Sequence, residues 1–337
     1  MQVPINCAVD SFITLGLIVP RQVDVVLNIF AKPYQTALAL LSLLKFSGQY
    51  VDCIYLQFEP SGSRYDAVPP YAITGYLQEN GYKLDIFQPD IWLECDPVDE
   101  SSLDKPAYRM AVRYQYAFEK TDKKYLFFMH NDVLIKRDII GAMLEQAGDA
   151  FAIGQIGQCW NCPASKPDLT EAANLGAACT PERYLEFRPT FAQLSSLYDE
   201  ARVHKVFVRP YWEGWDAQYS WQSWPLPECR VNEWGCMVDI EQTRPLTIPQ
   251  GKILPFGAFE HCGSVTLDTA VAWFRELSRL GMKARHFPLD KYLTHFVGNH
   301  RITRELHMQA ELNAQELLLR SFPDFASWFR AKRNKLF

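Results

Sequence analysis

Two side chains that could bind a metal follow a nearly all-apolar run. Residues 125–129 read Tyr-Leu-Phe-Phe-Met, and His130 and Asp132 come directly behind them. Such a run predicts a buried central strand, with both side chains at its carboxyl end. A carboxylate with one imidazole suits a manganese or magnesium ion that bridges a diphosphate, although an ordinary turn is the alternative. His295, with His300 as the second choice, would complete the ligand set from a distant loop.

Two arginines precede this strand at helical spacing. Arg109 and Arg113 lie four positions apart within residues 108–119, which predict a helix, so both should lie on one helix face. The planar guanidinium group donates paired hydrogen bonds to phosphate oxygens. The pair therefore predicts contacts with a diphosphate, and the alternative is a solvated helix face.

Four of the nine cysteines predict a structural zinc site. Cys159 and Cys162 form a Cys-x-x-Cys pair, and Cys179 and Cys229 stand in loop-like sequence that could supply the second pair. Cys236 is the rival of Cys179, although its apolar neighbours favour a packed thiol. Four thiolates leave no coordination position open, so the zinc would be structural. No strand-to-helix pattern follows the Cys-x-x-Cys pair, which disfavours a redox role.

An aromatic segment could bind a sugar acceptor. Residues 211–224 carry four tryptophans among acidic and amide side chains. Sugar rings stack on aromatic faces, and carboxylates and amides bond their hydroxyl groups. Glu213, Trp215 and Asp216 are the predicted acceptor contacts, and the alternative is a small aromatic core.

Strand-like and helix-like patterns alternate along the first half of the chain. Their order predicts an α/β fold, a mostly parallel sheet with helices on both faces that binds ligands at the carboxyl ends of its strands. Residues 155–242, rich in cysteine and tryptophan, break the pattern and are predicted to be an insertion. The predicted strands are 23–30, 53–58, 83–87, 125–129 and 283–287, and the predicted helices are 34–46, 71–79, 108–119, 266–280 and most of 305–337.

The composition is that of a soluble globular protein. Of the 337 residues, 48% are hydrophobic and 22% are charged. The net charge of -5 disfavours a nucleic-acid partner, which needs a basic surface. The sequence has no signal-peptide pattern and no membrane-length apolar run, which predicts a cytoplasmic protein with reduced cysteines. Residues 322–337 mix aromatic and basic side chains, which predicts docking on the chain itself or peripheral contact with the inner face of the membrane.

Several of these segments, in this order, resemble one family. Residues 113–132 resemble the segment that leads into the Asp-x-Asp motif of GT-A-fold, family-2-like glycosyltransferases. Residues 23–44 resemble the first strand and helix of that family, and residues 267–295 resemble its acidic-pair helix and the histidine that follows. Two positions depart from the family pattern: His130 stands where the first Asp would be, and Tyr114 replaces an Asn.

The resemblance implies a nucleotide-sugar-binding enzyme. It implies transfer of a sugar, with inversion, from a nucleoside-diphosphate donor to a hydroxyl of a glycan or glycolipid, a reaction of polysaccharide biosynthesis. Asn28, Phe30 and Glu59 match the nucleotide contacts of the family. Asp268 matches its catalytic base, which takes the proton of the acceptor hydroxyl, and the alternative is a helix-capping role. The other carboxylates that could act as the base are Glu260, Asp216 and Glu233.

The resemblance also implies a domain organisation. It predicts a single GT-A-like catalytic domain over residues 1–300, which includes the insertion 155–242, and a helical extension over residues 301–337. Two other functions stay open. A nucleotidyltransferase is expected to carry a glycine-rich loop after its first strand, and residues 28–34 contain no glycine. A non-catalytic nucleotide- or sugar-binding protein of the same fold is compatible with the departure at His130.

Overall fold

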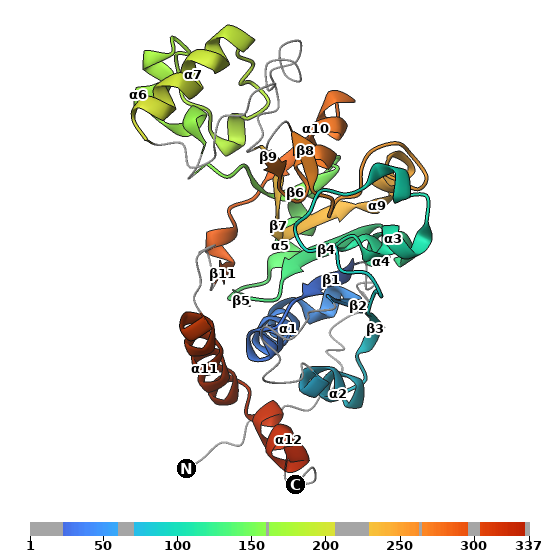
Figure 1. Cartoon of the computed structure of the whole chain (residues 1–337). Coiled ribbons are helices and arrows are strands. Elements are labelled where there is room, and N and C mark those ends of the chain that lie inside the picture. The colour runs from blue at the N-terminus through green and yellow to red at the C-terminus, as the bar shows by residue number, and fades with distance from the viewer. Residues whose placement is uncertain are drawn as a thin grey trace.

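The structure is a computed structural model that describes residues 23–59, 71–159, 162–205, 229–262, 265–295 and 304–333. Its centre is a seven-stranded sheet (Figure 1). In spatial order the strands are β10 (Ala284–His286), β6 (Ala152–Ile156), β7 (Val231–Asp239), β4 (Tyr125–His130), β1 (Val23–Ile29), β2 (Val51–Phe58) and β3 (Lys83–Phe87). Within this sheet β7 runs antiparallel to β4 and β6, and the other pairings are parallel.

Helices cover both faces of this sheet. Val26 packs with Phe128 and Trp273 in one core, whereas Val25 and Leu27 pack in a second core, because alternate residues of β1 point to opposite faces. The predicted α/β fold, a mostly parallel sheet with helices on both faces, is confirmed. The helices of the first core are α4 (Gln115–Lys120), α6 (Pro167–Ala172), α7 (Phe191–Val203) and α10 (Val271–Arg279), and those of the second are α1 (Pro33–Ser47), α2 (Tyr71–Glu79), α5 (Ile139–Ala147), α11 (Arg304–Ser321) and α12 (Pro323–Arg333).

Short elements complete the description. Two small antiparallel sheets pair β5 with β11 and β8 with β9. Their strands are β5 (Val133–Ile135), β11 (Leu293–His295), β8 (Glu260–Cys262) and β9 (Val265–Leu267). The short helices are α3 (Pro106–Ala111) and α9 (Ile240–Thr243). The 3-10 turns are η1 (Gly48–Tyr50), η2 (Glu100–Ser102), η3 (Pro163–Ser165), η4 (Pro181–Arg183), η5 (Arg244–Leu246) and η6 (Leu289–Lys291).

Two predicted helices and the predicted insertion differ from the structure. The helix predicted at 108–119 is two helices, α3 and α4, because Tyr114 between them has a φ of 64° and breaks the hydrogen-bond pattern. The helix predicted at 266–280 is the strand β9 followed by α10, with Ala270 at a φ of 67° before the helix. The segment 155–242 is not wholly an insertion, since it contains β7 in the middle of the sheet.

The C-terminal helices α11 and α12 pack against the first half of the chain. Glu311 accepts hydrogen bonds from the main-chain N–H groups of Tyr34 and Gln35 at the start of α1. On α12, the rings of Phe325 and Trp328 contact the ring of Tyr76, with centroids 5.1 and 5.5 Å away. No helix in the described part of the chain is long and apolar enough to cross a membrane.

Candidate active site

His130, Asp132 and His295 come together at the carboxyl end of β4. The antiparallel pairing of β11 with β5 sets His295 opposite Val133, next to this strand end. Nε2 of His295 lies 3.1 Å from Oδ1 of Asp132 and 3.2 Å from Nδ1 of His130. One ligand atom from each residue lies within 4.8 Å of the other two. Two imidazoles and a carboxylate are a donor set that fits a divalent ion such as Mn²⁺. We call these three residues the triad.

Asp132 is held by a lysine as well as by the histidines. Its carboxylate is buried, and Oδ2 lies 2.7 Å from Nζ of Lys32, which follows β1 with a φ of 60°. Burial alone would raise the pKa of Asp132. The hydrogen bond with His295 and the charges of Lys32 and His130 outweigh burial and lower this pKa below its ordinary value. Asp132 is therefore ionised at neutral pH.

A chain of charged contacts joins the triad to Asp268. Nε2 of His130 lies 3.4 Å from Oε1 of Glu233 on β7. Glu233 also pairs with Arg230, whose Nη2 lies 2.9 Å from Oδ2 of Asp268. Arg230 is 3% exposed, so it is a buried cation between two carboxylates. Burial would raise the pKa of Glu233, but the charge of Arg230 and the hydrogen bond with His130 lower it below its ordinary value.

Asp268 lies between β9 and α10, and not within a helical turn as predicted. The N-cap position of α10 is Ala270. The Asp268 carboxylate accepts hydrogen bonds from Nε2 of Gln158 at 3.3 Å and from the main-chain N–H of Thr269 at 2.9 Å. Its side chain is 27% exposed. Several partners therefore hold the Asp268 carboxylate in one orientation, and part of its side chain is exposed.

A second cluster surrounds Glu59 at the ends of β1 and β2, and we call it the Glu59 cluster. Asn28 donates to Oε1 of Glu59, and Nε of Arg113 lies 2.9 Å from the same oxygen. Nε1 of Trp92 donates to Oε2 at 3.1 Å, and the Trp92 ring stacks on Phe30 with centroids 6.0 Å apart. Asn28 stands opposite the last residue of β4 in the strand register, so the cluster adjoins the triad.

The two arginines have different surroundings. Arg113 lies beyond the end of α3, bridges to the main chain of Gly257 and belongs to the Glu59 cluster. Arg109 is 6% exposed, and its Nε lies 2.8 Å from Oε1 of Glu119 on α4. The prediction of one shared helix face is wrong, because α3 ends before Arg113. Arg109 therefore ties α3 to α4.

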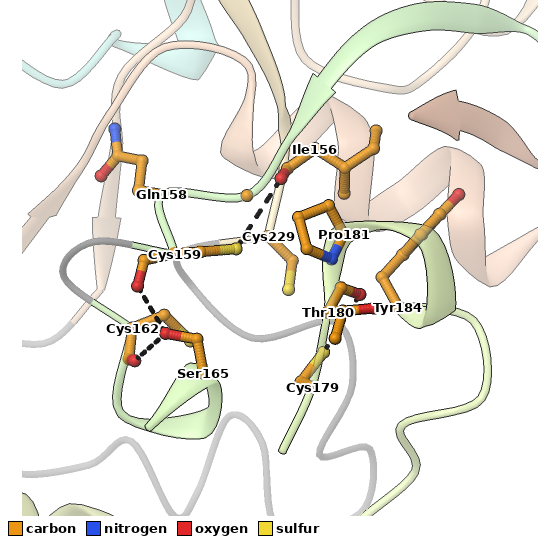
Figure 2. A pocket seen from close by; sticks show the side chains of 11 residues that line it. Ile156, Gln158, Cys159, Cys162, Ser165, Cys179, Thr180, Pro181, Tyr184 and Cys229 are labelled. Carbon is orange, nitrogen blue, oxygen red and sulfur yellow. Dashed lines mark hydrogen bonds between the residues drawn. The ribbon is translucent and has the colours of Figure 1, made fainter. Parts of the chain in front are cut away.

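The four cysteines predicted to bind zinc line one small pocket (Figure 2). Cys159, Cys162, Cys179 and Cys229 all contribute to its wall. Cys236 is buried within β7 opposite Phe128 and does not belong to the described lining of this pocket. Of the two rivals, the fold therefore brings Cys179 to the other three cysteines.

Some predicted residues lie outside the described part of the chain. These are the acceptor candidates Glu213, Trp215 and Asp216 and the fallback ligand His300. Their roles stay predictions from the sequence.

Three residues of the site escaped the sequence analysis. Lys32 carried a local signal, since a lysine directly behind the first strand and before a proline stands at the ligand-binding edge of the sheet. Trp92 and Arg230 carried none, because only the fold brings them to Glu59 and Asp268.

Comparisons with known proteins give distant structural matches. No protein-family model and no curated protein sequence matches the chain. The chain is similar to the mannosyltransferase PcManGT from Pyrobaculum calidifontis, solved in complex with GDP-Man and Mn²⁺, at 11% identity and a TM-score of 0.43, over 92% of this chain and 73% of that one. It is similar to glucosyl-3-phosphoglycerate synthase from Mycobacterium tuberculosis, solved with Mn²⁺ and UDP-glucose, at 12% identity and a TM-score of 0.38, over 88% and 78% of the two chains. It is also similar to the galactosyltransferase LgtC, at 10% identity and a TM-score of 0.33, over 66% and 59% of the two chains. Similarity at this level carries no argument about the chemistry or the substrates of this chain.

Proposed function

We propose that this chain is a glycosyltransferase that uses a nucleoside-diphosphate sugar. The observation that carries the proposal is that the triad, the Glu59 cluster and Asp268 lie together at the carboxyl edge of one mostly parallel sheet. Ligands of such sheets bind at this edge. A place for a metal, a place for a nucleoside and an oriented carboxylate are the parts that sugar transfer from a nucleotide requires.

The Glu59 cluster would hold the nucleoside. Phe30 and Trp92 offer stacked ring faces to a nucleobase. Oε1 of Glu59 is engaged by Asn28 and Arg113, whereas Oε2 accepts one hydrogen bond within the described residues, from Trp92. A carboxylate oxygen has two lone pairs, so Oε2 can accept a second hydrogen bond from a ribose hydroxyl.

The triad and Lys32 would hold the diphosphate. A divalent ion bound by His130, Asp132 and His295 would neutralise negative charge on the departing diphosphate. The ammonium group of Lys32, next to Asp132, can turn to a phosphate oxygen and add a second positive charge. The pairing of Asp132 with cationic groups keeps its carboxylate ionised for this role.

Asp268 would activate the acceptor. The acceptor oxygen bonds to the anomeric carbon, the bond from that carbon to the diphosphate breaks, and the hydroxyl proton passes to the Asp268 carboxylate. Arg230 and Gln158 fix the direction of this carboxylate. Attack from the face opposite the diphosphate inverts the anomeric carbon. A glycan or glycolipid is the acceptor class that the sequence resemblance implies.

A thermal-shift screen of nucleoside diphosphates with and without Mn²⁺ tests the binding half of the proposal. A ligand that binds only the native state at 100 times its Kd stabilises it by about 2.7 kcal/mol. We expect a Mn²⁺-dependent shift with one nucleotide, lost in Asp132→Ala and kept in Asp149→Ala, an exposed control. No shift with any nucleotide would refute the proposed site.

Turnover separates an enzyme from a binding protein. We expect slow release of nucleoside diphosphate from the preferred nucleotide sugar, since water can replace the acceptor. Asp268→Asn should keep nucleotide binding and lose this release by about 100-fold or more, the usual range for loss of a general base. Binding without release in the native chain would favour the non-catalytic alternative.

A further inference from the structure

We propose that Cys159, Cys162, Cys179 and Cys229 bind one structural zinc ion. This inference is independent of the proposed function, since the four cysteines contact neither the triad nor Asp268 in the described interactions. Its basis is that cysteines up to 70 positions apart, from Cys159 to Cys229, line one small pocket. Figure 2 shows their side chains around its wall.

The cysteines come from the two ends and the interior of one segment. Cys159 follows β6, and Cys229 precedes β7, the antiparallel neighbour of β6 in which Val231 pairs with Ile156. Cys162 stands at the start of η3, and Cys179 stands just before η4. The two interior positions are joined by the main chain, because the N–H of Cys179 donates to the carbonyl of Ala164 at 2.8 Å. The pocket therefore lies where the segment leaves the sheet after β6 and returns to it before β7.

The chemistry of the wall fits zinc. Four thiolates are a complete tetrahedral ligand set for Zn²⁺, with Zn–S distances of about 2.3 Å and hence sulfur separations of about 3.8 Å. All four side chains are thiols in the structure. Within the described residues no three of their sulfur atoms lie within 4.8 Å of one another, so the side chains must rotate inward on binding. Rotation about the Cα–Cβ bond moves a cysteine sulfur between staggered positions, and the four side chains border one pocket.

The described part of the segment that the zinc would secure packs into the first core. It holds the short helix α6 and α7, at the end of the molecule opposite α12 (Figure 1). In this described part, Leu169, Leu194 and Leu197 are buried, and Tyr184 and Tyr198 pack in the same core. A metal that joins four points of a chain removes much of the freedom of the loops between them and stabilises the folded form. A closed four-cysteine site has no position for substrate, so we assign it a structural role.

Metal analysis of the purified full-length chain tests the site. We expect about one zinc per chain after gel filtration, the content of a single four-cysteine site. Cys159→Ser/Cys162→Ser should lower the zinc content about tenfold or more, whereas Cys95→Ser, at an exposed cysteine outside the pocket, should retain it. His130→Ala/Asp132→Ala should also retain it, which separates this zinc from a metal at the triad.

A second measurement needs no variant and so does not depend on the folding of one. Exchange of the zinc for Co²⁺ should produce the visible absorption of a tetrahedral ion and the near-ultraviolet charge-transfer bands of cobalt thiolates. Removal of the metal with a chelator should raise amide hydrogen exchange in residues 162–205 before it does so in β1 and β4. Three results would each overturn the proposal. They are an intact mass that shows disulfides among these cysteines, loss of the zinc in His130→Ala/Asp132→Ala, and a metal-free chain in which all four thiols react with a thiol reagent.

Discussion

Replacement of Lys32 by methionine should tighten the binding of Mn²⁺ in the absence of nucleotide. Nζ of Lys32 lies 2.7 Å from Oδ2 of Asp132. An ion bound by Asp132 would therefore share this carboxylate with a positive charge. Methionine keeps an unbranched apolar stem and removes the charge, so the variant isolates the electrostatic effect.

The size of the effect follows from the contact. A unit charge about 5 Å from a divalent ion is repelled by about 2 kcal/mol at the dielectric constant of water and about 7 kcal/mol at an effective value of 20. The side chain of Lys32 is 20% exposed and can turn toward solvent, which favours the lower end of this range. We expect Lys32→Met to bind Mn²⁺ about 10- to 100-fold more tightly, or about 1.4 to 2.7 kcal/mol.

The free-ion signal of Mn²⁺ in electron paramagnetic resonance measures this affinity directly. Asp132→Ala should abolish binding at the triad, and Lys136→Met, at an exposed lysine beside β5, should leave it unchanged. With nucleoside diphosphate present the order should reverse, because Lys32→Met also loses a contact to phosphate. Unchanged or weaker Mn²⁺ binding by Lys32→Met would refute the assignment of Asp132 as a shared ligand.

Substitutions at three further positions test the packing that supports the site. Arg230→Met should lower the free energy of unfolding by about 3–5 kcal/mol in urea titrations, because it leaves the buried Glu233 without its cation; a loss below about 1 kcal/mol would contradict that pairing. Glu311→Ala should cost about 1–3 kcal/mol, since two N–H groups of α1 lose their acceptor, whereas Glu316→Ala on the exposed side of α11 should cost under about 0.5 kcal/mol. Burial raises the pKa of Glu311, so the native state binds the proton of this carboxyl more tightly than the unfolded chain does. The free energy of unfolding should therefore fall as the pH rises above about 4.3, the ordinary pKa of a glutamate. Glu311→Gln should not show this fall. Gly257→Ala should weaken nucleotide binding about tenfold by calorimetry, because its Cβ would overlap the carbonyl of the bridge partner in the Glu59 cluster; unchanged binding would show that this bridge does not position the cluster.

The sequence was sufficient for those parts of the fold that carry a local pattern. β1 and β4 read as strands because their residues are buried on both faces and therefore apolar. The strand β7 was not predicted, because buried polar side chains interrupt its apolar pattern. Nδ2 of Asn232 donates to the carbonyls of Gln155 and Gly157, and Glu233 pairs with Arg230; these partners are known only once the chain is folded.

The same distinction applies to the site. His130 and Asp132 could be predicted as neighbours because they end one strand, and the structure adds His295 at the expected position. The role of Arg109 could not be settled from spacing, since its surroundings depend on the break before Arg113. Lys32 could have been predicted as a site residue, because it stands directly behind the first strand, but it was not.

A histidine at position 130 has a physical explanation in this site. Nδ1 of His130 faces His295 and Asp132, and its Nε2 faces Glu233 at 3.4 Å. An imidazole can offer one nitrogen to a metal and donate a hydrogen bond to a carboxylate with the other, an arrangement that orients the ring. An aspartate at this position would set two carboxylates side by side in a buried site, with Arg230 already shared by Glu233 and Asp268. His130 and Glu233 are therefore complementary, and through Arg230 they connect the triad to the carboxylate proposed as the base.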